Sequence, residues 1–404
     1  MKQFLFRLSL SALLLSSVAH AQVGPLDARN NLSDVANPTT SLRNLGGAPL
    51  AAFSPIFGTG ADGALSCSSG TTTLTRDMNY TNVTVSGSCQ IKTNSFWIRA
   101  NGTCDLTNAG AGAIQNSAKN PGNSAVGATG ATLVSPGYGI GTLPFLAVAG
   151  ATGGTGNTTT GNNPTISVTT VPFGLSTGTP GAGGKGGNGT SSGAAGLNGV
   201  MPNSFNTLLS QVPPLLTIPY GGNSATQNII SPSFLGGPGG QGGGDGTNAG
   251  GGGGSPGYGG GFLGLACAAI NRGASTAVAA LQAKAANGGN GGNAAGGNAG
   301  GGAGAGGSTG GVIYVVTETL LGSLATNALD ASGGNGGAGG NGAGTGIGGT
   351  GGTGGGGGSI FVHVIGSTPS YTQKTASGAG AAATTATTTA GTAGGAGFVQ
   401  QGNL

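Results

Sequence analysis

The sequence predicts an all-β and irregular fold, in which a short β-solenoid is followed by a polyglycine-II helix bundle with repeated β-strands. Three observations indicate this: glycine is abundant, charged residues are scarce, and short apolar runs recur along the chain. Of the 404 residues, 95 are glycine, 18 are proline and only 5% are charged. Average proteins contain about 7% glycine and about 25% charged residues, so an ordinary globular enzyme is not expected.

The first 21 residues, MKQFLFRLSLSALLLSSVAHA, are typical of a secretory signal peptide. Lys2 and Arg7 flank the start, an apolar run follows, and Ala19-His20-Ala21 offers a small-x-small cleavage site. The alternative is an uncleaved membrane anchor, for which the run is short. We therefore expect a secreted, extracellular or virion-associated protein with no membrane span after cleavage, in a compartment that permits disulfides.

Residues 61–115 contain short β-branched and aromatic runs, which predict strands at 71–75, 83–85, 90–92 and 96–99. The phrases Gly87-Ser88-Cys89-Gln90-Ile91 and Gly102-Thr103-Cys104-Asp105-Leu106 superpose with an offset of 15 residues. We interpret them as successive rungs of a small β-solenoid stalk. Stacked residues lie about 4.8 Å apart, within the reach of a disulfide between Cys89 and Cys104. Two free buried thiols are the alternative, and the pairing of Cys67 and Cys267 stays open.

Glycine dominates residues 236–404, which we interpret as a repeat scaffold. Phrases that begin at Ala286, Ala331 and Ala376 are spaced by 45 residues, and each opens a glycine-rich tract. Apolar strands are predicted after these tracts at 312–316, 360–365 and 398–400, whereas alanine-rich residues 274–286 predict a short helix. Residues 116–235 are interpreted as a loop-rich region.

Long glycine tracts lose much backbone entropy when they become ordered, so their order requires compensation. Extended helices with three residues per turn have no internal hydrogen bonds, but neighbouring helices can bond laterally. Only glycine at the contacts lets the backbones approach closely. The phrases GGNGGNAAGGNAGGGAG and GGNGGAGGNG suit such a bundle. A disordered glycine-rich tail is the alternative.

Residues 22–60 are interpreted as an attachment segment because of a resemblance to a known family. NNLSDVANPTTSLRNLGG followed by APLAAFSPIFGTG resembles the linker repeats of bacteriophage tail fibres. In that family such segments form interlocked β-structure in trimeric shafts and contribute to attachment. The resemblance implies a homo-oligomer and points to a trimer. The signal peptide departs from that family and leaves open a prophage remnant or a bacterial surface protein.

Residues from about 180 to 404 are similar to the distal glycine-rich adhesins of T-even-like phages, in which polyglycine-II helices stack and the loops bind the host surface. The resemblance implies an adhesin that binds a cell-surface receptor, either protein or glycan. Exposed aromatic side chains provide large contact areas. The candidate receptor-binding residues are therefore Tyr138, Phe145, Phe173, Phe205, Tyr220, Phe234, Tyr258 and Phe262. The alternative function is a secreted bacterial structural protein that self-assembles into extracellular filaments.

The sequence offers little for catalysis. His363 is the only histidine after the leader, and its strand context predicts a structural residue with one face toward solvent. Glu318 is the only glutamate, and no close carboxylate pair, zinc motif or calcium repeat is present. The net charge of +4 gives no basic patch for nucleic acid. We therefore predict no enzyme activity, no cofactor and no metal.

Overall fold

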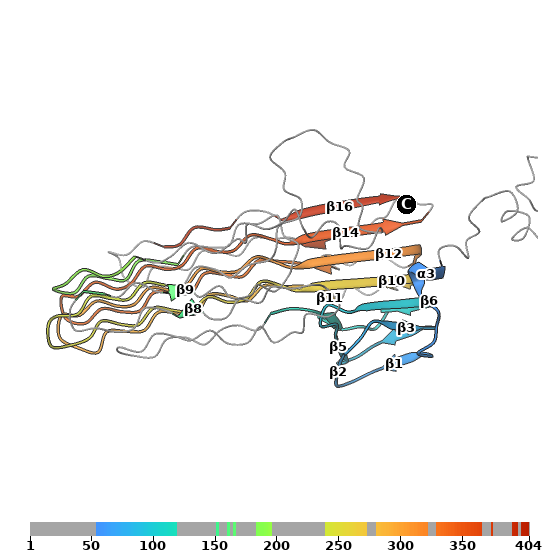
Figure 1. Cartoon of the computed structure of the whole chain (residues 1–404), viewed down its shortest axis with the longest axis horizontal. Helices are drawn as coiled ribbons and strands as arrows, with labels where there is room; N and C mark the ends of the chain where they lie inside the picture. The colour runs from blue at the N-terminus through green and yellow to red at the C-terminus, as the bar shows by residue number, and fades with distance from the viewer. Residues whose placement is uncertain are drawn as a thin grey trace, which may run out of the picture. The chain divides into compact units, whose positions relative to one another are not determined.

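The computed structural model describes residues 54–118, 151–152, 160–161, 165–166, 183–195, 239–272, 280–321, 329–365, 373–374, 390–394 and 397–403. The predicted signal peptide and most of the attachment segment lie outside these residues. The chain divides into two units, Met1–Pro55 and Ile56–Leu404, and the description below concerns the second (Figure 1).

The regular secondary structure of the described residues is nearly all β, organised mainly in two parallel sheets (Figure 1). The larger sheet has eight strands, with β1, β4, β6, β10, β12, β14 and β16 in this order and β3 beside β6. Its strands are β1 (Leu65–Cys67), β3 (Met78–Tyr80), β4 (Val83–Val85), β6 (Trp97–Asp105), β10 (Phe262–Asn271), β12 (Val312–Leu321), β14 (Ser359–Val364) and β16 (Phe398–Asn403).

The smaller sheet has six short strands, which pair in the order β15, β13, β11, β7, β5, β2. Its strands are β2 (Thr71–Thr73), β5 (Gln90–Lys92), β7 (Ile114–Gln115), β11 (Leu281–Gln282), β13 (Leu329–Asp330) and β15 (Gln373–Lys374). Separate from both sheets are the antiparallel pair β8 (Ala151–Thr152) and β9 (Thr165–Ile166) and the four-residue helix α3 (Ser54–Phe57).

The hydrophobic core joins the two sheets. Along β10, alternate residues Leu263, Leu265 and Cys267 belong to the core, as the two-residue period of a strand requires. The smaller sheet contributes Ile114 and Leu281 to the same cluster. The chain therefore passes repeatedly from one sheet to the other, which leaves all the ladders of these two sheets parallel.

The strand predictions at 71–75, 83–85, 90–92, 96–99, 312–316, 360–365 and 398–400 are confirmed, because each overlaps a strand of the structure. The helix predicted at 274–286 is wrong in its described part. Leu281 and Gln282 form β11, which pairs with β7 and β13. Leucine and glutamine are good helix formers, but at these two positions the backbone pairs with neighbouring strands instead.

The predicted stacking with a 15-residue offset is wrong. Gln90 lies on β5 of the smaller sheet, whereas Cys104 lies on β6 of the larger one, so the two phrases belong to different ladders. True neighbours in the larger sheet include Val83 and Cys104, and those in the smaller sheet include Ile91 and Ile114. Paired residues are therefore more than the expected 15 residues apart in the chain, because the chain visits both sheets in between.

The predicted Cys89–Cys104 disulfide is consequently wrong as well. Cys89 is bonded to Cys67, with their Cα atoms 5.8 Å apart, and Cys104 is bonded to Cys267, with their Cα atoms 6.0 Å apart. The second bond joins the neighbouring strands β6 and β10, and its two cysteines are 163 residues apart in the chain. Disulfide geometry limits the Cα separation, so pairing follows the ladder rather than the sequence phrases.

Glycine-rich tracts leave the smaller sheet, turn, and return to the larger sheet. After β11, residues 283–294 run outward and residues 299–311 return to β12; after β13, residues 331–342 run outward and residues 346–358 return to β14 (Figure 1). Residues 249–261 return to β10 in the same way. These connections have no strand pairing of their own, so their backbone hydrogen bonds must be found elsewhere.

The tract 299–311, here called the central tract, bonds to its neighbours with a three-residue period. One set of N–H groups donates to the tract 346–358: those of Gly301, Gly304, Gly307 and Gly310. A second set donates to the tract 283–294: those of Gly302, Ala305, Ser308 and Gly311. Gly300 and Ala303 donate to Gly243 and Gly240. All these bonds are between 2.8 and 3.4 Å long. The N–H groups of consecutive residues in these sets therefore point to three different neighbouring segments.

Three further segments donate to carbonyl groups of the central tract. Gly251 donates to Gly300, Gly340 donates to Gly302, and Gly187 donates to Gly301. The central tract is therefore surrounded by six extended segments, to which its backbone is hydrogen-bonded. Side chains would prevent this approach: a methyl group on Gly304 would place its carbon 1.8 Å from the carbonyl oxygen of Gly337.

The repeat differs from the 45-residue spacing expected. Leu281 pairs with Leu329, and the side chain of Asn287 accepts a hydrogen bond from Asn335, which lies 48 residues further on. At this step the expected spacing is three residues too short, which is one period of the tract, whereas at the next step Leu329 pairs with Gln373, 44 residues further on. Because glycine-rich phrases look alike after such a shift, only the strand ladder fixes the register.

Candidate functional site

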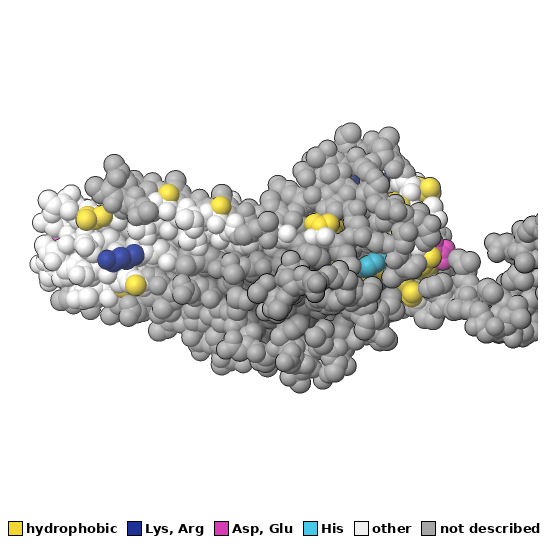
Figure 2. Space-filling model, turned by 90° about the horizontal axis from the view of Figure 1, so that it is seen from above, with side chains coloured by type: hydrophobic (Ala, Val, Ile, Leu, Met, Phe, Trp, Pro, Cys, Tyr) yellow, Lys and Arg dark blue, Asp and Glu magenta, His cyan; other side chains and the backbone are white. Residues whose placement is uncertain are grey.

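The best-defined candidate site is a group of turns at the end of the tracts away from the sheets, here called the tip (Figure 1). It comprises residues 188–191, 245–248, 296–298 and 344–345. Thr190, Thr247, Asn298 and Thr345 are exposed there. Figure 2 shows that the described surface at this end consists mainly of polar side chains and backbone.

Asp245 connects two of these turns. Its carboxylate accepts hydrogen bonds from the backbone N–H groups of Thr247 (3.0 Å), Asn248 (2.6 Å) and Asn298 (2.8 Å). The bonds from Asn248 and Asn298 hold the pKa of Asp245 well below its usual range. Asp245 is thus ionised at neutral pH, and its charge is used to fix the backbone.

Asn298 connects the second turn to the third. Its side-chain oxygen accepts a hydrogen bond of 3.1 Å from the backbone N–H of Thr345. Gly344, which precedes Thr345, has a backbone φ of +52°, a conformation that residues with a side chain rarely adopt. Asp245, Asn298 and Thr345 therefore form a continuous polar network across three turns. This network fixes the exposed hydroxyl and amide groups relative to one another.

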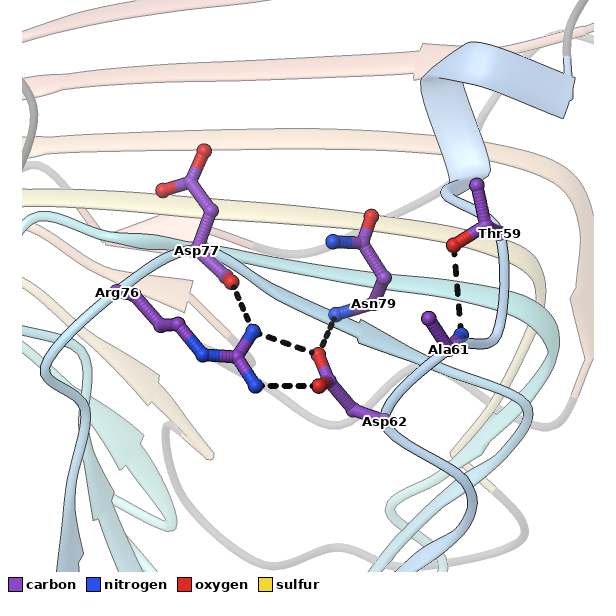
Figure 3. A network of polar contacts seen from close by, with 6 residues as sticks. All are labelled: Thr59, Ala61, Asp62, Arg76, Asp77 and Asn79. Carbon is purple, nitrogen blue, oxygen red and sulfur yellow. Dashed lines mark hydrogen bonds and ion pairs between the residues drawn. The ribbon is translucent and has the colours of Figure 1, made fainter.

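A second polar cluster lies near the start of the described chain (Figure 3). The Arg76 guanidinium binds the Asp62 carboxylate, which also accepts the backbone N–H of Asn79 at 2.7 Å. The Arg76 hydrogen bond is the main reason that the pKa of Asp62 is lowered. Asp77 similarly binds Arg99 at 2.9 Å. Both carboxylates are engaged by arginine and backbone, so this cluster joins neighbouring segments of the chain and does not present an acid–base pair.

His363 is buried, contrary to the expectation that one face meets solvent; it is 4% exposed. Both ring nitrogens lack a hydrogen-bond partner, and burial lowers the pKa of the imidazole. Its ring lies 5.4 Å from that of Tyr314, whose pKa burial raises to about 12. Desolvation thus favours the neutral form of both groups.

The aromatic residues predicted to bind a receptor are not at the tip in the described part of the chain. Tyr258 and Phe262 are buried, so the expectation that they are exposed is wrong. The other six candidates, Tyr138, Phe145, Phe173, Phe205, Tyr220 and Phe234, lie outside the described residues. Phe262 instead packs edge-on against Trp97, with ring centroids 5.4 Å apart.

The burial of Phe262 follows from its place on the larger sheet. Gly264 pairs with Trp97 on one side and with Tyr314 on the other. Because Gly264 has no side chain, the two rings meet across β10 with centroids 5.8 Å apart. Aromatic residues at strand starts therefore form a ladder on the sheet.

The tip residues were not predicted, because exposed aromatic side chains were expected to form the binding surface. A signal was present: Asp245-Gly246-Thr247-Asn248 is a turn sequence in which an aspartate bonds the backbone two residues on. Across the described segments, no group of three or more His, Cys, Asp or Glu side chains is placed to hold a metal ion.

No protein-family model, curated protein or solved structure matches this chain. Within the part of the chain that the structure describes, no helix has the length and apolar character needed to cross a membrane.

Proposed function

We propose that the protein is an adhesin that binds a cell-surface receptor, either protein or glycan, through the tip, and that it has no catalytic activity. The network that joins Asp245, Asn298 and Thr345 carries this proposal. A binding surface whose groups are already fixed loses less conformational entropy when the partner arrives. The tip meets this condition although it is built from turns.

The proposal includes the architecture of the scaffold. We infer that the glycine tracts are polyglycine-II helices, because their hydrogen bonds repeat every three residues and point to three neighbours. We further infer that the strands are rungs of a β-solenoid, since the chain alternates between two parallel sheets. In this interpretation the solenoid is the base and the helix bundle holds the tip at a distance from it.

Export is part of the same proposal. The predicted signal peptide leads to an extracellular or virion-associated location, and the two disulfides are typical of oxidising compartments. The homo-oligomer, with the trimer implied by the tail-fibre-like segment, remains a prediction.

The test is binding of the fluorescently labelled protein to a panel of intact bacterial cells. On a cell type that binds, the exposed tip variants Thr247→Trp and Thr345→Trp should reduce binding at least about tenfold, because a bulky ring disrupts the fit of a contact surface. Thr72→Trp is the matched control, because Thr72 is an exposed threonine on β2. Equal binding by all three variants would contradict a role for the tip.

A structural role in filaments is the second candidate. It is favoured by β16, which ends the larger sheet and exposes 37% of Val399. Open strand edges are templates for pairing with another chain. Electron micrographs of the purified protein distinguish the two: discrete particles support the adhesin, whereas long filaments support the structural role.

A further inference from the structure

The outward-running tracts 283–294 and 331–342 contain four asparagines that are directly followed by glycine: Asn287, Asn290, Asn335 and Asn341. Such a pair is chemically labile, because the backbone nitrogen of a residue without a side chain can reach the side-chain carbonyl carbon of the asparagine. The peptide group between the two residues must turn for this attack. The hydrogen bonds of the folded chain therefore decide which pair reacts.

Asn290 and Gly291 are held at both reacting groups. The side-chain oxygen of Asn290 accepts the backbone N–H of Ala338 at 2.8 Å, and the N–H of Gly291 donates to the carbonyl of Ala338 at 2.8 Å. Asn287 and Gly288 are held by residue 335 in the same way, again with two bonds of 2.8 Å. In each pair, two hydrogen bonds must break before the glycine nitrogen can meet the side chain.

Asn341 and Gly342 lack this hold. Among the described residues, neither the side chain of Asn341 nor the N–H of Gly342 makes a hydrogen bond. The backbone of Asn341 is bonded to the preceding tract: its N–H donates to the side chain of Asn293 at 2.8 Å, and its carbonyl accepts the N–H of Ala294 at 2.9 Å. Only the second of these bonds opposes rotation of the peptide group toward the side chain.

Exposure does not distinguish the pairs, because the side chains of both Asn290 and Asn341 are exposed to water. Their places in the tracts do differ. Asn341 lies where its tract passes into the turn that carries Thr345, and Gly344 in this turn already has a φ of +52°. Segments at the ends of packed elements open at a lower free energy than those in the middle. The position of Asn341 therefore adds to the effect of the missing bonds.

We propose that Asn341–Gly342 is a self-modification site, at which the folded protein converts Asn341 to aspartate and isoaspartate. The backbone nitrogen of Gly342 forms a bond to Cγ of Asn341, the bond from Cγ to Nδ2 breaks, and Nδ2 leaves as ammonia with the proton that the backbone nitrogen gives up. Water then opens the resulting succinimide ring. Attack at Cγ gives aspartate, whereas attack at the backbone carbonyl carbon gives isoaspartate.

Both products alter the chain beside the tip. Each carries a new carboxylate, whereas Lys284 is the one charged residue in the sequence of the two tracts. Isoaspartate also adds one carbon atom to the backbone, directly before the turn that carries Thr345. The protein would thus change slowly with age at this one place. The inference depends on the hydrogen bonds around Asn341 and not on receptor binding by the tip.

The test is incubation of the full mature protein at physiological pH and temperature, followed by digestion and mass spectrometry. Each converted site is recognised by the mass change from amide to acid, and chromatography separates isoaspartate from aspartate. We expect Asn341 to convert at least about fivefold faster than Asn290, because one more hydrogen bond must open at Asn290. The variant Asn341→Gln should lose the fast conversion, since glutamine would have to form a larger ring.

The matched control is the same protein unfolded in guanidinium chloride with reductant. There the hydrogen bonds are absent, so Asn290 and Asn341 should convert at similar rates. The proposal is overturned if Asn341 of the folded protein stays an amide for as long as the unfolded protein needs to convert. It is also overturned if Asn290 converts as fast as Asn341 in the folded protein.

Discussion

Replacing Gly304 by alanine is expected to destabilise the protein by about 2 kcal/mol or more. Alanine restricts the unfolded chain and by that effect alone would stabilise the fold by about 0.4–1 kcal/mol. The added carbon, however, would lie 1.8 Å from the backbone oxygen of Gly337, and backbone held by hydrogen bonds on several sides cannot move away easily. Overpacking of this kind typically costs about 1–3 kcal/mol and occasionally more, so the clash decides the sign.

The measurement is the midpoint of thermal unfolding, which the variant should lower by several degrees. Ala303→Gly is the control in the neighbouring position: Ala303 is fully buried, so this variant removes a methyl group from the same tract. It should cost less than Gly304→Ala, because it creates no clash. An unchanged midpoint for Gly304→Ala would mean that the central tract is not packed against its neighbours.

Removing the Cys104–Cys267 disulfide is expected to destabilise the protein more than removing Cys67–Cys89. A crosslink limits the entropy of the unfolded chain, and its effect grows with the number of residues enclosed. The separations are 163 and 22 residues, which correspond to about 5 and about 3 kcal/mol. The longer link also joins β6 to β10, which pair in the larger sheet although their bonded cysteines are 163 residues apart in the chain.

The comparison uses two double variants, Cys104→Ala/Cys267→Ala and Cys67→Ala/Cys89→Ala, unfolded by heat without reductant. The first should show the lower midpoint. In the presence of reductant, the wild type should fall to or below the midpoint of the first variant. The reverse order of the two variants would contradict the assignment of Cys104–Cys267 as the main crosslink.

Many of the strands could be predicted because their residue types are local signals. The β-branched runs at Val83–Val85 and Ile313–Val316 form strands wherever they can be half or fully buried. The position of each strand in the ladder could not be predicted in this way, because it depends on the number of residues between consecutive strands of the sheet. That number is set by the tracts, whose three-residue repeat makes several registers look equally good.

The disulfides and the candidate site were missed for related physical reasons. Cys104 meets Cys267 only because β10 pairs with β6, and no local phrase encodes a pairing across 163 residues. Tyr258 and Phe262 were expected at the surface, but Phe262 starts a strand of the larger sheet and is buried there. The tip depends on Asp245 and Asn298, whose N–H contacts come from turns that the tracts bring together.

The central claim is that the glycine tracts form an ordered, hydrogen-bonded bundle that holds the tip in place. Amide hydrogen exchange of residues 299–311 in the native protein tests it most directly, because nearly every N–H in this tract has a backbone partner. We expect slow exchange, comparable to that of β12, since both should open only when the protein unfolds more widely. Exchange as fast as that of an unprotected glycine-rich peptide would contradict the bundle and the tip that it supports.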